Sequence, residues 1–571
     1  MKLSFKTIFT ATTLLVVASF SLFSAPSTYI IPFESSIYDD IEALYLVSGY
    51  GTPSNKRPWS SAEALLILSR IDESLLSNAM QEYYWEIKEE VARPLRYQFD
   101  DLVELGFFFD LNAEMYTHSN GSDFPNESDW DFGFPERSPM LRLRFDMAFS
   151  DFLYIYSDLQ YQRNRFRFGD DIGKFNITKE EGISTGAGPG SYMVKSSIYN
   201  RSFLTNWMPT TFDVDFQIPK RALISTGGKH WNLSLARDKI RWGNGHSGNF
   251  VISDHDDYQE YLRFVVFSDK FSYDWTNMFF ETNINTAESA SADKEFKIFM
   301  AHRLEFRPID RITLALSENV MYQNDVFSLR HFNPANVYHN LNNNSMFNAI
   351  AHIELDVMIV PGVNFYGQYV LDQAIAPNES ASQANAYGYL VGIEHALSIH
   401  KGILFSSLEF ATTSPAMYRR KLVDFITFRR YHGNDTSFVT HFDYLGYEYG
   451  GDAQVLQLDI AYRLPKDRNI ALQLFYMRHG MRHGEIDFFT PNSVVNATAK
   501  LESAPSGPVV AETFKASIAG EYSIEDVVAF VDTRIWAHLA YVGKREYTKA
   551  TQDYSALQSD VQFTLGVSLT L

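Results

Sequence analysis

The chain ends in the sequence VQFTLGVSLTL at residues 561–571, in which large apolar side chains alternate with polar or small ones. The same alternation appears in LRLRFDMAFS at residues 141–150, where the second set includes Arg142, Arg144 and Asp146. A period of two is typical of a β-strand with one apolar and one polar face. A cation turned toward lipid costs about 2–4 kcal/mol near the membrane midplane, so we expect these charged residues to line the lumen of a barrel.

Further runs with a period of two occur at residues 296–306, 353–359, 363–371 and 456–462. Between such runs, short connections alternate with long loops rich in Gly, Asn and Ser. We place the short turns at residues 150–151, 227–228, 268–270, 307–310, 361–362, 401–402, 464–467 and 523–526. In outer-membrane barrels, short turns face the periplasm and long loops face outward. The pattern predicts an all-β transmembrane barrel of about 18 antiparallel strands; the alternative is a periplasmic or secreted β-sandwich or β-helix.

The first residues have the composition of an export signal. Basic residues precede an apolar stretch from Ile8 to Phe23, and two small residues follow it. This order is typical of a signal peptide that is removed on export, so we assign residues 1–25 to one. Beyond it the sequence contains no apolar run of about 18 residues, and we expect no transmembrane helix in the mature protein.

The next segment has helical periodicity instead. Apolar residues recur at helical spacing from Ile37 to Tyr45, and the run ends at Gly49. Ser60 and Glu63 then have the spacing of a capping box, in which the hydroxyl accepts from the Glu63 amide and the carboxylate reaches back to the Ser60 amide. Short helices need partners, so we expect these to pack on one another or against the barrel. The predicted order is a signal peptide at residues 1–25, a small periplasmic α-helical domain at 26–95 and an outer-membrane β-barrel at 96–571.

The composition excludes several classes of protein and site. There is no Cys, which excludes a lipid-anchored lipoprotein, disulfide bonds and thiolate metal sites. The net charge of −20 argues against nucleic acid as a partner. Mean hydropathy is slightly negative, as expected where alternate residues face a wet lumen. We find no serine elbow, no HExxH motif and no phosphate-binding loop, and predict no catalytic residue, no cofactor and no enzyme activity.

The sequence RWGNGHSG at residues 241–248 follows a strand and opens a long outward connection. Its glycines permit sharp backbone turns. Trp242 offers an aromatic face for a sugar ring, and Arg241, Asn244 and His246 offer hydrogen-bond donors. The alternative is a Gly-rich loop folded into the barrel mouth, with Trp242 as packing. The nearby acidic residues 254–257 are interpreted as a solvated loop, and no metal site is predicted.

A second region, residues 316–339, mixes aromatic, amide and Arg side chains without a grouping of nucleophile and base. Tyr322, Arg330, Asn333 and Tyr338 are its candidate contacts. This chemistry suits the binding of a carbohydrate or the closing of a lumen.

These motifs resemble the Wzi family of capsule-assembly outer-membrane proteins. The similarity lies in Arg57-Pro58-Trp59-Ser60 before Glu63, in residues 241–248 with Phe250-Val251-Ile252-Ser253 after them, and in residues 316–334, which include Glu318, Tyr322, Phe327 and Asn333-Pro334. The resemblance implies an eighteen-stranded barrel with a periplasmic helical bundle, acting as a lectin that attaches capsular polysaccharide to the cell surface. His246 and Asn244 depart from the family pattern, which places an aromatic residue and a Pro there.

We therefore expect a non-enzymatic outer-membrane barrel that binds surface polysaccharide of the capsular type through its outward loops and lumen mouth. Outer-membrane lipids are expected to surround it, and its helical domain is a candidate contact for a periplasmic export partner. The alternative is a porin or solute channel that the helical domain gates.

Overall fold

The computed structural model describes residues 26–571 except for residues 94, 96, 100–101, 125–129, 134–135, 163–165, 169–182, 188–192, 196–204, 208–218, 281–295, 325–327, 342–346, 375–384, 420–422, 435–436, 481–502 and 529–530. The signal peptide predicted at residues 1–25 lies outside the described residues. Within the described ranges, no helix combines the length and the apolar composition needed to cross a membrane.

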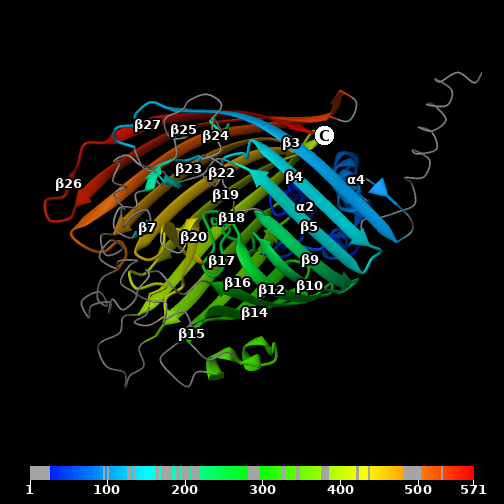
Figure 1. Ribbon diagram of the computed structural model, residues 1–571, viewed down its shortest axis with the longest axis horizontal. Coiled ribbons are helices and arrows are strands. Elements are labelled where there is room, and N and C mark those ends of the chain that lie inside the picture. Colours follow the sequence, from blue (N-terminus) through cyan, green and yellow to red (C-terminus); the bar gives the residue numbers. More distant parts are fainter. Residues whose placement is uncertain are drawn as a thin grey trace, which may run out of the picture.

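A closed antiparallel barrel contains most of the described residues (Figure 1). Its sheet joins twenty strands, of which β2 (Tyr97–Gln98) and β26 (Asp553–Tyr554) are two-residue additions, so eighteen strands form the wall. The last strand pairs with the first, with Gly566 opposite Glu114, and closes the ring. The wall strands are β3 (Val103–His118), β4 (Leu141–Phe149), β5 (Leu153–Tyr161), β9 (Arg221–Gly228), β10 (Trp231–Asp238), β12 (Gln259–Phe267), β13 (Phe271–Phe280), β14 (Phe296–Ile309), β15 (Ile312–Asn324), β16 (Phe347–Val360), β17 (Val363–Gln373), β18 (Ala386–Ile399), β19 (Gly402–Thr413), β22 (Ala453–Leu464), β23 (Arg468–Gly480), β24 (Val509–Val528), β25 (Val531–Thr548) and β27 (Gln558–Thr570).

Short and long connections alternate around the wall, as predicted. The short turns gather at the end of the barrel where the chain terminates (Figure 1). Three predicted turns were wrong in position. Residues 307–309 belong to β14, which continues through a register shift between Phe306 and Ile309. Gly227 pairs with Asn232 and belongs to β9, because the reversal occurs two residues later. Residues 523–526 belong to β24, which continues through a register shift between Ile524 and Val528.

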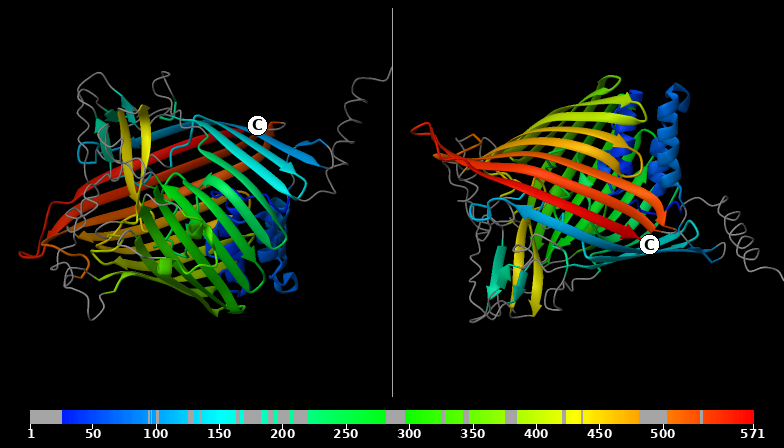
Figure 2. Two further views of the ribbon diagram at one scale, coloured as in Figure 1. Left: turned by 60° about the horizontal axis from the view of Figure 1, so that its bottom comes forward. Right: turned by 90° about the horizontal axis from the view of Figure 1, so that it is seen from above.

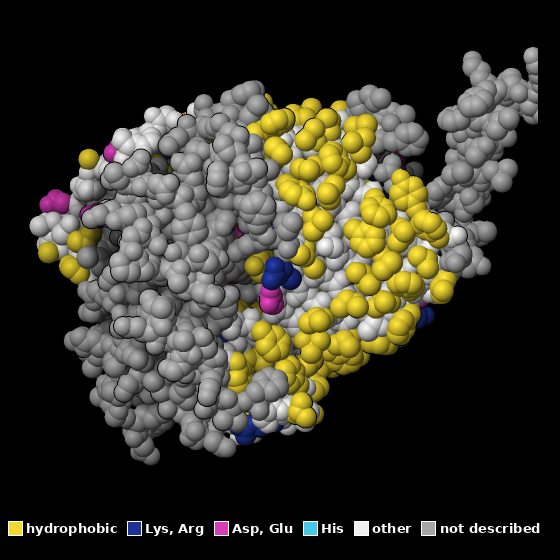
Figure 3. Space-filling view, in the orientation of Figure 1, with side chains coloured by type: hydrophobic (Ala, Val, Ile, Leu, Met, Phe, Trp, Pro, Cys, Tyr) yellow, Lys and Arg dark blue, Asp and Glu magenta, His cyan; other side chains and the backbone are white. Residues whose placement is uncertain are grey.

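The two faces of the wall differ in polarity. On β14, Arg303 and Glu305 point inward and are 1% and 0% exposed, whereas Leu304 and Phe306 point outward and are 44% and 48% exposed. Outward hydrophobic side chains form a broad belt over the strands (Figure 3). Ring closure pairs the strand edges, whose backbone groups would otherwise each cost several kcal/mol in lipid. These features confirm the predicted transmembrane barrel.

The described residues that precede the barrel form three α-helices: α2 (Ile37–Ser48), α3 (Ser61–Leu68) and α4 (Asn78–Val91), with a short 3-10 helix, η1 (Glu73–Leu75), before α4. The predicted capping box is half right. The Ser60 hydroxyl accepts from the Glu63 amide at 3.2 Å. The Glu63 carboxylate forms an ion pair with Lys56 in place of the expected contact with the Ser60 amide, because Lys56 is buried beside it.

The helices pack against the barrel at its turn end (Figure 2). Their apolar faces share one hydrophobic cluster with four inward side chains of the wall, Met358, Ala396, Ile403 and Phe405. Because this cluster joins helices and wall, the helical segment and the barrel share one core.

Much of the lumen is packed, which corrects the expectation of a wet interior. Two outward connections reach inward: residues 239–258, called the inward loop below, and the described residues at the two ends of the connection 414–452. Their side chains, including Trp242, Phe250, Tyr418 and Tyr447, form a hydrophobic cluster with inward residues of the wall such as Phe299. Short strands outside the wall are β1 (Lys56–Arg57), β6 (Phe166–Phe168), β7 (Ile183–Ala187), β8 (Met193–Lys195), β11 (Arg241–Trp242), β20 (Ile426–Asn434) and β21 (Ser437–Tyr444).

Candidate functional site

The inward loop meets the N-terminal segment inside the barrel. Strand β1 pairs with β11, so that Lys56 lies opposite Trp242 and Arg57 opposite Arg241. The Gly243 amide also donates to the carbonyl oxygen of Asn55 at 2.7 Å. The segment that enters from the turn end, residues 50–60, and the loop that enters from the other end are therefore joined by backbone hydrogen bonds. We call residues 50–60 the N-terminal plug.

Carboxylates of the wall bind the plug. The Thr52 hydroxyl donates to Asp356 at 3.0 Å, and the Asn55 amide donates to Asp356 at 2.6 Å and to Glu354 at 3.3 Å. Glu354 is in turn paired with Arg303. All five side chains are buried. Buried polar groups are costly unless they are hydrogen-bonded, so these contacts fix the plug in one position within the lumen.

The inward loop depends on a glycine at a special backbone conformation. Gly243 has φ +132°, and an added Cβ would lie 2.0 Å from Oδ1 of Asn249. The residue before it, Trp242, is 0% exposed, and its backbone amide donates to Ile252 at 3.1 Å. The loop thus folds on itself with the indole ring at its centre, as in the packing alternative considered from the sequence.

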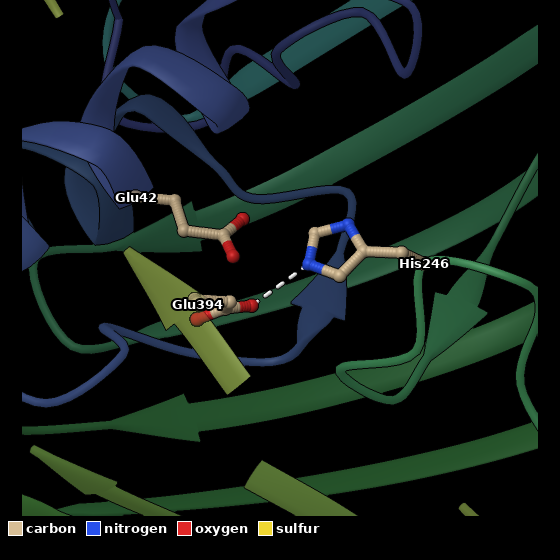
Figure 4. A group of neighbouring side chains, drawn as sticks. All are labelled: Glu42, His246 and Glu394. Atoms are coloured by element: carbon tan, nitrogen blue, oxygen red, sulfur yellow. Dashed lines mark hydrogen bonds and ion pairs between the residues drawn. The ribbon is translucent and has the colours of Figure 1, made fainter. Parts of the chain in front are cut away.

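His246 lies in a cluster of acidic side chains (Figure 4). Its Nε2 atom is 2.7 Å from Oε1 of Glu394 on β18, and Glu42 of α2 points toward the same ring. Its backbone amide donates to Glu409 at 2.8 Å. Burial would lower the pKa of His246, but the hydrogen bond to Glu394 and the negative charges of Glu394, Glu42 and Glu409 raise that pKa to about 10.

A cavity of about 410 Å³ lies next to this cluster. Arg241, Asn244 and His246 line it together with Glu42, and its lining extends to Arg534 beside the turn end of the barrel. Asp39 also borders the cavity. Although burial would raise the pKa of Asp39, the adjacent Arg463 and Arg57 hold it well below its usual range.

The second predicted region divides between the wall strand β15, which contains residues 316–324, and the connection after it, whose described residues lie on the outside of the wall. We call Tyr322, which faces outward, and these residues of the connection the outer-wall region. The connection after β15 contains two 3-10 helices, η7 (Leu329–Phe332) and η8 (Tyr338–Leu341), which lie outside the strands (Figure 1). Tyr338 is buried there, stacks on His302 with 5.2 Å between ring centroids, and accepts a hydrogen bond from Trp275 at 2.5 Å. Trp275 and His302 share the outward face with the exposed Leu304, since Trp275 pairs with His302 and Tyr273 with Leu304. The connection is therefore held against the exterior of the barrel.

The structure does not bring all eight predicted contacts together. Arg241, Asn244 and His246 line the lumenal cavity, and Trp242 is buried beside them. Tyr322, Arg330, Asn333 and Tyr338 belong to the outer-wall region, where Tyr322 packs on His331, Arg330 is half-buried and Asn333 is exposed. Their contact with carbohydrate stays a prediction.

Sequence reasoning missed the carboxylates that organise the lumen. Glu394, Glu409 and Asp356 occupy inward positions of strands, where the period of two predicts any polar residue. Nothing local distinguishes them from other inward acids, and Glu42 looks like one polar position of a helix. Their shared location follows only from the closure of the ring and the entry of the plug.

A comparison with known protein families assigns the chain to one of them. The profile of the family Capsule assembly protein Wzi matches residues 133–532, well over half of the chain. The chain belongs to the Wzi family. No curated protein matches the chain in sequence.

Among solved structures, a similar one is Wzi of Escherichia coli, described as an outer-membrane protein involved in group 1 capsule assembly and as a carbohydrate-binding β-barrel. It is 13% identical, with a TM-score of 0.54, and the match covers 95% of this chain and 99% of that one. At this identity the likeness shows a shared fold.

Two further matches are more distant. An OmpT loop-deletion mutant of Vibrio cholerae is 8% identical, with a TM-score of 0.32, over 82% of this chain and 100% of that one. OprD of Pseudomonas aeruginosa is 6% identical, with a TM-score of 0.33, over 82% and 95%. Likenesses this low add nothing to the assignment of function.

Proposed function

We propose that this Wzi-family barrel binds surface polysaccharide of the capsular type at the outer face of the outer membrane and holds it there without catalysing a reaction. The observation that carries the proposal is the packed lumen. The plug and the inward loop pair inside the barrel, and buried carboxylates fix them. A barrel filled in this way is suited to presenting a binding surface and poorly suited to passing solutes.

The outer-wall region supplies the polysaccharide contacts in this proposal. Arg330 is half-buried and lies within η7, and Asn333 is exposed and follows it. The Ser328 cap holds the start of η7 in place. Amide and guanidinium donors suit the hydroxyl and carboxylate groups of an acidic polysaccharide. The buried Trp242 acts by supporting the inward loop and not by stacking on a sugar.

The binding test uses the purified full-length barrel in detergent and capsular polysaccharide from its own host. We expect Arg330→Ala combined with Asn333→Ala to weaken binding at least about tenfold, since each lost charged or amide contact is worth about 0.5–3 kcal/mol. The matched control is Lys401→Ala, which removes an exposed cation from the opposite, turn end of the barrel. Binding that is unchanged in the double variant rejects these contacts, and no binding by the wild type rejects the function.

The helical segment has a separate role in the proposal. Residues 1–25 are taken as the export signal, and residues 26–95 as a periplasmic unit that carries the plug. Its last helix, α4, presents Trp85 at 46% exposure, and we infer that this face meets an export partner in the periplasm. Trp85→Ala is expected to weaken cross-linking of that partner while leaving polysaccharide binding unchanged.

Single-channel recording separates this function from a gated channel. A packed lumen predicts almost no conductance in a planar bilayer. Frequent current steps in the wild type, which grow when residues 35–95 are deleted, would favour the channel.

A further inference from the structure

Three metal-ligating side chains from three separate elements meet beside the lumenal cavity (Figure 4). Glu42 lies on α2, His246 on the inward loop and Glu394 on β18, and one donor atom of each lies within 4.8 Å of the other two. We propose that Glu42, His246 and Glu394 bind a divalent transition-metal ion, with Zn²⁺ as the best fit, inside the barrel. This inference does not depend on polysaccharide binding.

The donor set suits zinc. Zn²⁺ takes imidazole nitrogen and carboxylate oxygen at about 2.0–2.2 Å, and its catalytic-type sites combine three protein ligands with water. Bonds of this length place tetrahedral ligand atoms about 3.4 Å apart. Because the donor atoms lie within 4.8 Å of one another, a carboxylate shift of at most about 1.4 Å brings Glu42 into range. The imidazole disfavours Ca²⁺ and Mg²⁺, which prefer oxygen ligands alone. The ion takes the place of the proton that Nε2 of His246 and Glu394 share, and that proton leaves to solvent.

Neighbouring groups already orient two of the ligands. The Asn364 amide donates to the second carboxylate oxygen of Glu394 at 3.0 Å. Glu409 accepts from the backbone amides of His246 and Ser247 at 2.8 Å each, which fixes the loop that carries the imidazole. Outer partners of this kind set the direction of metal ligands in proteins.

The third ligand is free to turn toward the ion. Glu42 is 3.6 Å from Arg57, whereas Arg57 makes a closer contact of 2.7 Å with Asp39. Arg57 therefore stays paired when Glu42 rotates. Glu42 and His246 both line the cavity, which offers space for water ligands and a route for the ion from the turn end.

An ion at this position would join three parts of the lumen. It would link the helix before the plug, the loop that enters from the opposite end and the wall itself. The proposed role is structural: the ion adds a fixed link from α2 to the inward loop and the wall, which the β1–β11 pairing does not provide.

Calorimetry with Zn²⁺ alone tests the site. The full-length barrel is purified in detergent, treated with a chelator and titrated with zinc chloride. We expect one ion per chain in the wild type, and at least about a tenfold loss of affinity in His246→Gln and in Glu394→Gln. Co²⁺ gives a second readout, because a four- or five-coordinate bound ion has visible absorption bands far more intense than those of aqueous Co²⁺, and the variants should lack this increase.

The control variant is His255→Gln. His255 is another lumenal histidine, paired with Asp443 at 2.9 Å and flanked by Asp254 and Asp256. It should bind zinc like the wild type. The proposal is overturned if His255→Gln loses zinc binding while His246→Gln keeps it. It is also overturned if the wild type binds no zinc. Folding of each variant is checked by its heat-modifiable migration, and Glu42→Gln decides the question if His246→Gln does not fold.

Discussion

Replacing Arg57 by Ala removes the cation at the junction of plug and inward loop. Arg57 donates to Asp39 at 2.7 Å, lies 3.6 Å from Glu42 and stands 4.7 Å from the ring centre of Tyr38. The Arg57 side chain is 10% exposed and the Asp39 side chain 39% exposed, so their pair is only half-buried. Removal of one partner costs about 3–5 kcal/mol in a buried pair, whereas an exposed pair contributes about 0–1 kcal/mol. Because Asp39 also keeps Arg463 at 2.8 Å, we expect an intermediate loss of about 2 kcal/mol. Since about 1.4 kcal/mol is a factor of ten, local opening of the plug should become about thirtyfold more frequent.

Hydrogen exchange measures this opening directly, because backbone amides exchange when their segment opens locally. Peptides covering α2 and the plug should exchange about thirtyfold faster in Arg57→Ala. The control is Lys401→Ala, which breaks a contact with Glu82 that is 3.2 Å long but solvent-exposed. Such pairs contribute about 0–1 kcal/mol, so its exchange should stay close to that of the wild type. Exchange in Arg57→Ala within about threefold of the wild type would refute the reasoning.

Three further predictions concern other parts of the molecule. Burial raises the pKa of Asp40 to about 7. The wild type should therefore lose stability as the pH rises from about 4 to 7. Asp40→Asn should raise the midpoint temperature of unfolding at about pH 8 but not at about pH 4. Gly243→Ala should destabilise the fold by about 1–3 kcal/mol in thermal unfolding, because of its positive φ and the Asn249 contact. Tyr338→Phe removes the hydrogen-bond acceptor for Trp275, which should cost about 1 kcal/mol. Proteolysis of the connection after β15 should become faster, while hydrogen exchange in the plug stays unchanged.

The barrel could be predicted because its signal is local. Each strand carries the period of two within its own residues, as in Arg303 and Leu304, and the asymmetry of turn lengths needs no knowledge of distant contacts. The strand ends were less predictable, since several turns lie two or more residues beyond their apparent position, as at Gly227.

The site was harder to predict because its contacts are remote in sequence. Trp242 looks available for a sugar, but its pairing with Lys56 buries it inside the barrel. Tyr338 looks like a residue of the barrel mouth, but its connection folds back over the outer wall to reach Trp275. The residues of these two connections carry no pattern that tells whether a connection folds into the lumen or back over the outer wall.

The most direct test is the amount of capsule that remains on cells after deletion of the gene. The account predicts that polysaccharide is still made but appears in the medium, and that the wild-type gene restores it to the cell surface while Arg330→Ala with Asn333→Ala restores it poorly. Cell-bound capsule that is unchanged by the deletion would contradict the account.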